Sequence, residues 1–181
     1  SSPIRDWLNF SGKECLSKRC YGFRGASGID GTLSLGMGLA KALGPMVLVT
    51  GDLALLHDSN GWLFAKNKGP CFLVFLIDNY GGGIFNQLDY MNMPISDFDM
   101  LFKMPQRVDP IALANAHGIP SRQVACLEDL KPSIEWAFSQ NGTVLVRACT
   151  NSESDARLRK ELRKEMCNYF KDYKKNTSSQ K

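Results

Sequence analysis

The sequence predicts an α/β fold, with a doubly wound, mainly parallel sheet that carries helices on both faces. Apolar runs at 46–50, 71–78 and 143–149 have the length of strands, and segments with helical patterning separate them. The run CFLVFLID at 71–78 is apolar almost throughout, as expected of a strand covered on both faces. At 181 residues and 44% hydrophobic composition, the chain is long enough for one packed domain.

The remaining elements follow the same alternation of strand and helix. The glycine-rich segment GTLSLGMGLAKAL otherwise consists of helix formers, and residues 53–66 keep helical character despite Gly61. The predicted helices cover 31–43, 53–66, 109–117 and 129–138. Besides the three long runs, we predict a weak strand at 20–23 and a short strand at 122–126. The segment 86–108 is too long for an ordinary connector, so it is either a lid or binding loop, or a surface excursion with a short helix near 97–103.

The net charge of +4 lies entirely in the C-terminal tail. Residues 153–181 contain nine Lys or Arg and five Asp or Glu, whereas residues 1–152 contain thirteen of each. A neutral body argues against a dedicated nucleic-acid surface. Apolar residues recur at helical spacing in the tail, which favours a packed amphipathic helix with a solvated basic face over a phosphate-binding arm. We therefore predict a domain over 1–150, followed over 151–181 by a basic amphipathic helix and a disordered end, KKNTSSQK.

No apolar run is long enough for a membrane span, and the first residues lack the pattern of a signal peptide. These features predict a soluble protein of the cytoplasm, and the plastid stroma is also compatible. The six cysteines form no CxxC pair, which favours reduced structural thiols over a zinc site. Because the chain begins without methionine, we expect it to be the C-terminal part of a longer polypeptide.

A carboxylate and an amide each follow one of the predicted strands. Asp52 comes just after the run at 46–50, and Asn79 just after the run at 71–78. If these parallel strands are neighbours, both side chains face one crevice at the carboxyl edge of the sheet. Mg²⁺ typically takes one or two carboxylates and leaves other positions to water and phosphate oxygens. The pair therefore predicts a site for Mg²⁺ and a diphosphate.

The glycines around this pair support the same interpretation. The loop DNYGGG allows a sharp turn and a close approach to an anion, and the Gly81 carbonyl is the candidate third metal ligand. Helices that begin after Gly31 and Gly51 would direct free amides toward phosphate. Either motif alone is more often a structural turn or helix cap. A dinucleotide fold is disfavoured because GMGLAK lies inside a helix, and His57 is more often a packed or solvated helix residue than a catalyst.

The spacing from GD to an asparagine and a glycine-rich loop resembles the cofactor motif of thiamine-diphosphate enzymes. The segments RGASGIDG at 24–31, GDLALLHDSNG, NYGGGIF and MPQRVD are similar to the C-terminal domain of the MenD family. This family comprises the 2-succinyl-5-enolpyruvyl-6-hydroxy-3-cyclohexene-1-carboxylate synthases of menaquinone and phylloquinone synthesis. The resemblance implies a transferase that uses thiamine diphosphate and Mg²⁺, with Mn²⁺ also possible. Its reaction decarboxylates 2-oxoglutarate and joins the remainder to isochorismate.

The resemblance also implies a role for individual residues. Asp52 and Asn79 would bind the metal through their side chains, and Gly81 through its carbonyl. Ile29 would support the bent cofactor between its two rings. The cofactor pocket would further include Leu53, Gly83, Ile84 and Phe85, and the substrates would contact Ser1, Arg5 and Arg24. Without the resemblance, Ile29 would count as core and Arg24 as a surface ion pair.

The sequence departs from the family pattern in three respects. SSPIRD is one residue shorter than the family's NSMPIRD, and Asp78 stands where the family often has asparagine. No glutamate occurs between Glu14 and Glu128, although the family uses one to activate the cofactor. In the family, that glutamate comes from the N-terminal pyrimidine-binding domain of a neighbouring subunit in a homo-oligomer. We therefore expect the chain alone to hold half a site and to be inactive.

Two other functions fit the same residues. The chain could belong to another thiamine-diphosphate-dependent decarboxylase or carboligase, related to acetohydroxyacid synthase, which would share the metal pair but lack the RGASGIDG context. It could also be a non-catalytic cofactor-binding remnant, or an interaction module whose basic helix docks a partner.

Overall fold

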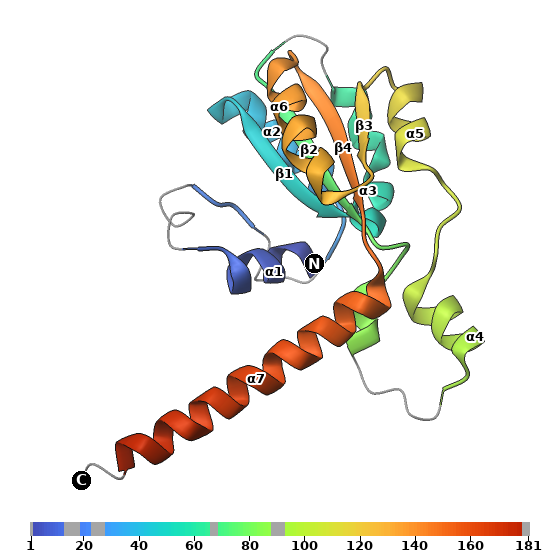
Figure 1. Ribbon diagram of the computed structural model, residues 1–181. Coiled ribbons are helices and arrows are strands. Elements are labelled where there is room, and N and C mark those ends of the chain that lie inside the picture. Colours follow the sequence, from blue (N-terminus) through green and yellow to red (C-terminus); the bar gives the residue numbers. More distant parts are fainter. Residues whose placement is uncertain (1, 13–18, 23–27, 66–68, 88–92, 179–181) are drawn as a thin grey trace.

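The computed structural model describes residues 2–12, 19–22, 28–65, 69–87 and 93–178, with side chains described as far as Phe170. Within this part, four strands form one fully parallel sheet (Figure 1). The sheet has the order β1-β2-β4-β3, and its strands are β1 (Met46–Gly51), β2 (Phe72–Asp78), β3 (Ser121–Val124) and β4 (Thr143–Cys149). The parallel sheet confirms the predicted fold class, and the predicted strands at 46–50, 71–78 and 143–149 are all present.

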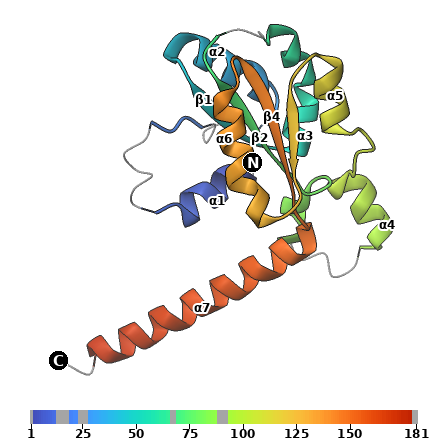
Figure 2. The same cartoon turned by 45° about the horizontal axis from the view of Figure 1, so that its top comes forward.

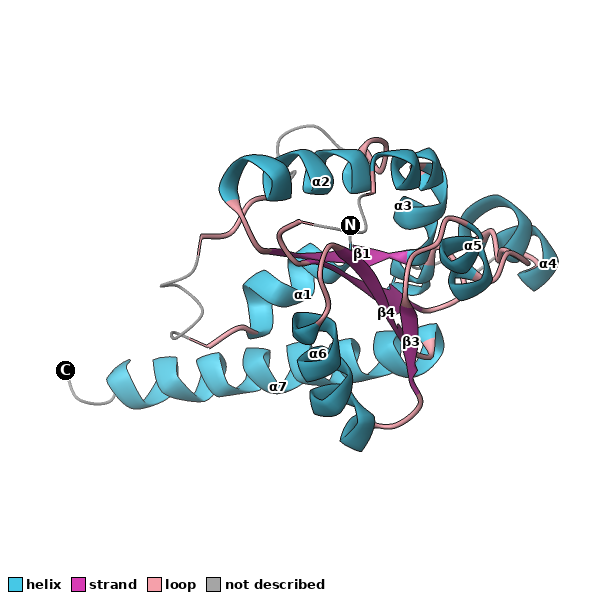
Figure 3. Ribbon diagram, turned by 90° about the horizontal axis from the view of Figure 1, so that it is seen from above, coloured by secondary structure: helices cyan, strands magenta, loops and turns pink. Residues whose placement is uncertain are grey.

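Helices cover both faces of this sheet. Seen from above in Figure 3, α2 and α3 lie on one side, and α1, α6 and α7 lie on the other. The α-helices are α1 (Ser2–Phe10), α2 (Thr32–Leu43), α3 (Asp52–His57), α4 (Ile95–Phe98), α5 (Pro110–Ala116), α6 (Leu130–Ser139) and α7 (Ser152–Ser178). Shorter helical turns are η2 (Ser59–Phe64), η3 (Gly83–Gln87), η5 (Leu127–Asp129) and the π-helix η4 (Asp99–Lys103).

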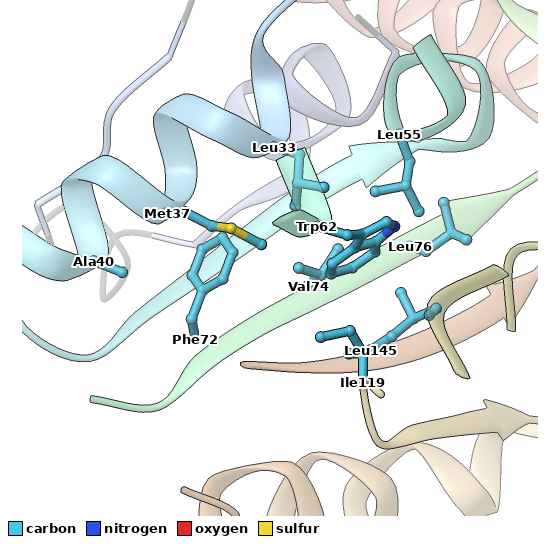
Figure 4. Packing of buried hydrophobic residues seen from close by; sticks show 11 residues of the cluster. Leu33, Met37, Ala40, Leu55, Trp62, Phe72, Val74, Leu76, Ile119 and Leu145 are labelled. Carbon is cyan, nitrogen blue, oxygen red and sulfur yellow. The ribbon is translucent and has the colours of Figure 1, made fainter. Parts of the chain in front are cut away.

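The core consists of two clusters separated by the sheet. On the α2 side, Leu33 and Trp62 pack with Val74 of the central strand β2 (Figure 4). Leu55 of α3, Ala114 of α5 and Leu145 of β4 extend this larger cluster. On the opposite face, a smaller cluster joins Leu73, Val144 and Val146 to Ala137 of α6. Because side chains alternate along a strand, β2 and β4 contribute to both clusters, as their nearly continuous apolar sequence predicted.

Two expectations about elements near β1 are corrected by the structure. Residues 20–22 form no strand, and Phe23 lies outside the described residues. Within the described residues β1 is therefore an edge strand, and Val47 and Val49 on its α1 side remain 44% and 38% exposed. The helix predicted over 53–66 is interrupted, because the Asp58 carboxylate turns to accept hydrogen bonds from the Ser34 N–H at 2.7 Å and its hydroxyl at 3.0 Å.

Helix α7 is present but does not pack as predicted. It projects away from the sheet (Figures 1 and 2), and the residues from Arg163 to Phe170 are all exposed. The contacts of its first turns include a two-pronged ion pair between Arg159 and Asp6 of α1, and a hydrogen bond that Arg163 donates to Gln87 at 2.8 Å. The helix continues to Ser178, past Lys174, where the composition predicted disorder to begin.

Replacement of Leu145 by alanine tests the larger core cluster. Leu145 is fully buried on β4, the other inner strand of the sheet, so its truncation leaves a cavity between the sheet and α5. We expect the free energy of unfolding to fall by about 2–5 kcal/mol in urea denaturation. Leu127→Ala is the matched control, because Leu127 is 79% exposed, and its effect should stay within about 0.5 kcal/mol. Equal effects of the two substitutions would contradict the assignment of the core.

Candidate cofactor-binding site

Asp52 lies at the point where β1 ends and α3 begins. Its side chain is buried, with 7% of the residue exposed, and both carboxylate oxygens accept backbone hydrogen bonds. Oδ1 accepts from Leu53 at 2.9 Å and Oδ2 accepts from Gly81 at 2.5 Å. The second bond joins the end of β1 to the glycine loop that follows β2. The register places Gly51 beside Ile77, which confirms that the two predicted strands are parallel neighbours.

The charge of Asp52 is not balanced by a basic side chain. The pKa of this carboxyl is raised to about 6, chiefly by burial and also by the nearby charge of Asp78, although the hydrogen bonds from Gly81 and Leu53 lower it. No Lys or Arg among the described residues forms an ion pair with it. A buried anion of this kind is favoured only when a cation neutralises it, and its oxygen suits a hard divalent ion.

The loop after β2 is tightly folded against η4. Gly81 has a φ of 121°, which only glycine adopts readily, and a Cβ at this position would overlap the carbonyl of Lys103. Gly82 donates to that same carbonyl at 2.5 Å. The three consecutive glycines of the loop are all buried. The predicted short helix near 97–103 is therefore present as α4 and η4, and it supports the glycine loop from one side.

Aromatic side chains add to this contact. The ring of Phe102 in η4 lies edge-on to Phe85 with a centroid separation of 5.6 Å, and it stacks on Phe98 at 5.9 Å. The described part of 86–108 therefore includes a short helical segment that packs on the glycine loop.

Asn79 stands at the start of the loop and is half-buried. A Cβ added at Gly83 would lie 2.5 Å from its Nδ2 atom and 2.8 Å from the Cβ of Ser152. The amide therefore lies against Gly83, near the first residue of α7. The structure thus joins Asp52 to Gly81 by a direct hydrogen bond and holds Asn79 two residues earlier in the same loop.

Asp78 and Arg147 form an ion pair that was not predicted from the sequence. Arg147 Nε donates to Asp78 Oδ2 at 2.8 Å, and Nη2 lies 2.8 Å from the same oxygen. Only 4% of the Asp78 side chain and 11% of the Arg147 side chain are exposed. The sequence does carry one sign of this ion pair, because Arg147 is a charged residue within the otherwise mainly apolar strand TVLVRAC. Its partner could not be assigned without knowing that β2 and β4 pair.

A pocket of about 260 Å³ opens between these groups and the segment that precedes α5. The charged and aromatic residues of its wall are Asp52, Asp78, Tyr80, Arg107, Asp109 and Arg147. No group of three or more His, Cys, Asp or Glu side chains within the described ranges is arranged to hold a metal ion. A metal here would therefore depend on amide, carbonyl, water or ligand oxygens beside Asp52.

The other predicted site residues are placed as follows. Ile29 is half-buried just before α2, and its carbonyl accepts from the Thr32 hydroxyl at 3.0 Å. Leu53, Ile84 and Phe85 are half-buried, whereas Arg5 on α1 and His57 at the end of α3 are exposed. Ser1 and Arg24 lie outside the described residues.

A parallel sheet with a buried carboxylate and a glycine loop at adjacent carboxyl ends defines a class of α/β domains that bind ligands at this edge. The family model described as "Thiamine pyrophosphate enzyme, C-terminal TPP binding domain" matches residues 9–148. The chain belongs to this family.

Curated relatives narrow the similarity further. The chain is 57% identical over 176 residues to a 2-succinyl-5-enolpyruvyl-6-hydroxy-3-cyclohexene-1-carboxylate synthase of Prochlorococcus marinus (strain MIT 9313), an alignment that covers 97% of this chain. It is 62% identical over 163 residues, or 90% of this chain, to the protein of that name from Parasynechococcus marenigrum (strain WH8102). The chain spans 30% and 29% of the length of these two relatives.

A solved structure shares the fold. Benzoylformate decarboxylase from Polynucleobacter necessarius superposes with a TM-score of 0.51 at 20% identity, covering 69% of this chain and 23% of that chain. In the part of the chain that the structure describes, no helix combines the length and apolarity that crossing a membrane requires.

Gly81→Ala tests the geometry of the glycine loop. Alanine would bring a Cβ onto the Lys103 carbonyl and would disfavour the positive φ at this position. We expect a loss of at least about 1–3 kcal/mol in the free energy of unfolding, measured by chemical denaturation. The control is Gly38→Ala in α2, where a Cβ meets nothing within 4 Å and should stabilise the helix by about 0.5–1 kcal/mol. A neutral Gly81→Ala variant would show that the loop is not held as described.

Proposed function

We propose that this chain is the cofactor-binding part of a synthase that requires thiamine diphosphate and Mg²⁺, with Mn²⁺ able to replace Mg²⁺. The reaction would decarboxylate 2-oxoglutarate and join the remainder to isochorismate, giving 2-succinyl-5-enolpyruvyl-6-hydroxy-3-cyclohexene-1-carboxylate in menaquinone or phylloquinone biosynthesis. The observation that carries the proposal is the buried, unneutralised Asp52 hydrogen-bonded to the glycine loop of the neighbouring strand. The relatives that bear this synthase name over 90–97% of the chain support the choice of substrates.

The residues present fit a divalent metal. Asp52 would contribute a carboxylate oxygen, Asn79 an amide oxygen and Gly81 its carbonyl. This sparse set of hard oxygens leaves room for diphosphate and water, which is the usual pattern for Mg²⁺. The positive charge would also offset the desolvation that raises the pKa of Asp52.

Other residues of the chain would position the cofactor and the substrates. Ile29 would support the cofactor between its two rings, and Leu53, Gly83, Ile84 and Phe85 would line its pocket. Ser1, Arg5 and Arg24 would contact the substrates, because a guanidinium pairs well with the carboxylates of 2-oxoglutarate and isochorismate. When bound, thiamine diphosphate supplies the stabilisation of negative charge that decarboxylation requires.

The proposal requires a partner domain. The chain has no glutamate between Glu14 and Glu128, so the group that activates the cofactor would come from a pyrimidine-binding domain of a neighbouring subunit in a homo-oligomer. The share of the relatives' length that the chain spans is consistent with such an additional domain. The enzyme would act in the cytoplasm, or in the plastid stroma if the protein is plastid-borne.

An activity assay of the whole polypeptide, obtained by extending the coding region upstream of Ser1, tests the proposed reaction. We expect product only when 2-oxoglutarate, isochorismate, thiamine diphosphate and Mg²⁺ are all present. Asp52→Ala should abolish product formation, and the isolated 181-residue chain should show none. Carboligation of pyruvate without isochorismate would instead indicate a different thiamine-dependent carboligase.

Cofactor binding should depend on pH through Asp52. The metal binds the ionised carboxylate, so Mg²⁺-dependent binding of thiamine diphosphate should weaken about tenfold per pH unit below about pH 6. For the metal-free chain the sign is opposite, because the folded state binds more protons than the unfolded state between pH 3.8 and about 6. Its stability should therefore fall as the pH rises through that window. Calorimetry and thermal melting between pH 5 and 7.5 measure both effects; a pH-independent affinity would contradict the role of Asp52.

A further inference from the structure

The backbone between the two loop ligands of the proposed metal site is held in an unfavourable conformation. Tyr80, which separates Asn79 from Gly81, has a φ of 61°. A non-glycine residue in this left-handed region is uncommon, and for a bulky side chain it costs on the order of 1–3 kcal/mol. Such a conformation persists only where surrounding contacts impose it. The turn at Tyr80 sets the directions of both the Asn79 side chain and the Gly81 carbonyl, so these contacts also determine where the two ligands point.

Asp78 provides the contacts that impose this turn. Its Oδ1 atom accepts the Tyr80 N–H at 3.0 Å, and its own carbonyl accepts the N–H of Thr150 at 2.8 Å. The Oδ1 atom of Asp78 is therefore engaged by the backbone of the loop, and its carbonyl holds the end of β2 to the residue that follows β4. This arrangement gives a physical account of the carboxylate at a position where the related family often has asparagine.

Arg147 in turn fixes Asp78. Two of its nitrogens reach Asp78 Oδ2 at 2.8 Å, and its guanidinium lies 5.9 Å from the centroid of the Tyr80 ring. The third contact is a longer one, 3.4 Å from Nη1 to Asp109 Oδ1, at the residue that caps α5. Arg147 thus joins the ends of β2 and β4, the loop and α5. Its charge also neutralises Asp78, so that Asp52 remains the buried carboxylate available to a cation.

We propose that Arg147 is a positioning residue for the metal and diphosphate ligands and that it acts through Asp78 on the turn at Tyr80. The inference rests on the proposed function, because it presumes that Asn79 and Gly81 face a bound divalent ion. Arg147 itself contacts neither the metal nor the substrate in this role. Groups that orient metal ligands in this way typically change metal affinity by 10- to 100-fold when they are replaced.

The test measures the affinity of the whole polypeptide, the protein used in the activity assay above, for Mn²⁺ in the presence of thiamine diphosphate, from the loss of the free Mn²⁺ signal in electron paramagnetic resonance. Arg147→Gln should weaken binding by about 10- to 100-fold, because Asp78 loses its partner and the turn relaxes. Arg122→Gln is the matched control, since Arg122 lies on the adjacent strand β3 over Trp136, and it should bind Mn²⁺ like the wild type. Melting temperatures of all variants are measured in parallel.

A second substitution separates positioning from general stability. In the double variant Asp78→Asn with Arg147→Gln, the amide oxygen of residue 78 still accepts the Tyr80 N–H and its amide nitrogen donates to the glutamine. We expect the double variant to recover most of the lost affinity, whereas a purely structural role for Arg147 would lower the melting temperature and leave affinity unchanged.

The outcomes are distinguishable. Wild-type whole polypeptide that fails to bind Mn²⁺ with thiamine diphosphate overturns the proposed function, and the inference with it. Wild-type binding together with unchanged affinity in folded Arg147→Gln overturns the inference alone, as does a double variant as weak as the single one. If Arg147→Gln does not fold, the Mn²⁺ affinity of Arg147→Lys is measured instead, because lysine keeps the charge but loses the two-pronged contact. A loss of about threefold or more supports the proposal, and wild-type affinity overturns it.

Discussion

Parallel pairing of β1 with β2 is the constraint on which the rest of the site depends. Because the strands run in the same direction and in register, Asp52 and the glycine loop leave the sheet at the same edge. A single hydrogen bond, from the Gly81 N–H to the Asp52 carboxylate, then joins the two strand ends. An antiparallel arrangement would place these groups at opposite edges, and no local feature of either motif could bring them together again.

The two buried aspartates at this edge have opposite electrostatic roles. Asp78 is neutralised by Arg147 at Oδ2 and accepts the Tyr80 N–H at Oδ1, so it serves the structure. Asp52 has backbone donors but no basic partner among the residues that the structure describes, and burial raises its pKa. An unneutralised buried carboxylate is unfavourable for folding by itself. Its presence beside a neutralised one is understandable if a cation completes the site, which connects the electrostatics of this edge of the sheet to the proposed function.

Close packing holds the loop in place. The π-helix η4 approaches the glycine loop so closely that only glycine fits at residue 81, and Phe102 of the same helix packs on Phe85 after the loop. Met104, just past this helix, also has a positive φ, at 46°, as does Tyr80 within the loop. Unfavourable backbone conformations on both sides of one contact indicate that tertiary packing, rather than local preference, fixes this region.

The sequence alone determined the fold class, the three long strands, and the position of Asp52 and Asn79 after adjacent strands, because burial on both faces leaves a continuous apolar run and strand ends carry polar residues. It predicted a strand at 20–23 that is absent from residues 20–22, and it predicted close packing for α7, most of whose described length is exposed. The local sequence pattern shows only that a helix or strand has an apolar face, and it does not show which other element covers that face. The Asp78–Arg147 pair was decided by tertiary structure, since 69 residues separate its members and only the β2–β4 register makes them neighbours.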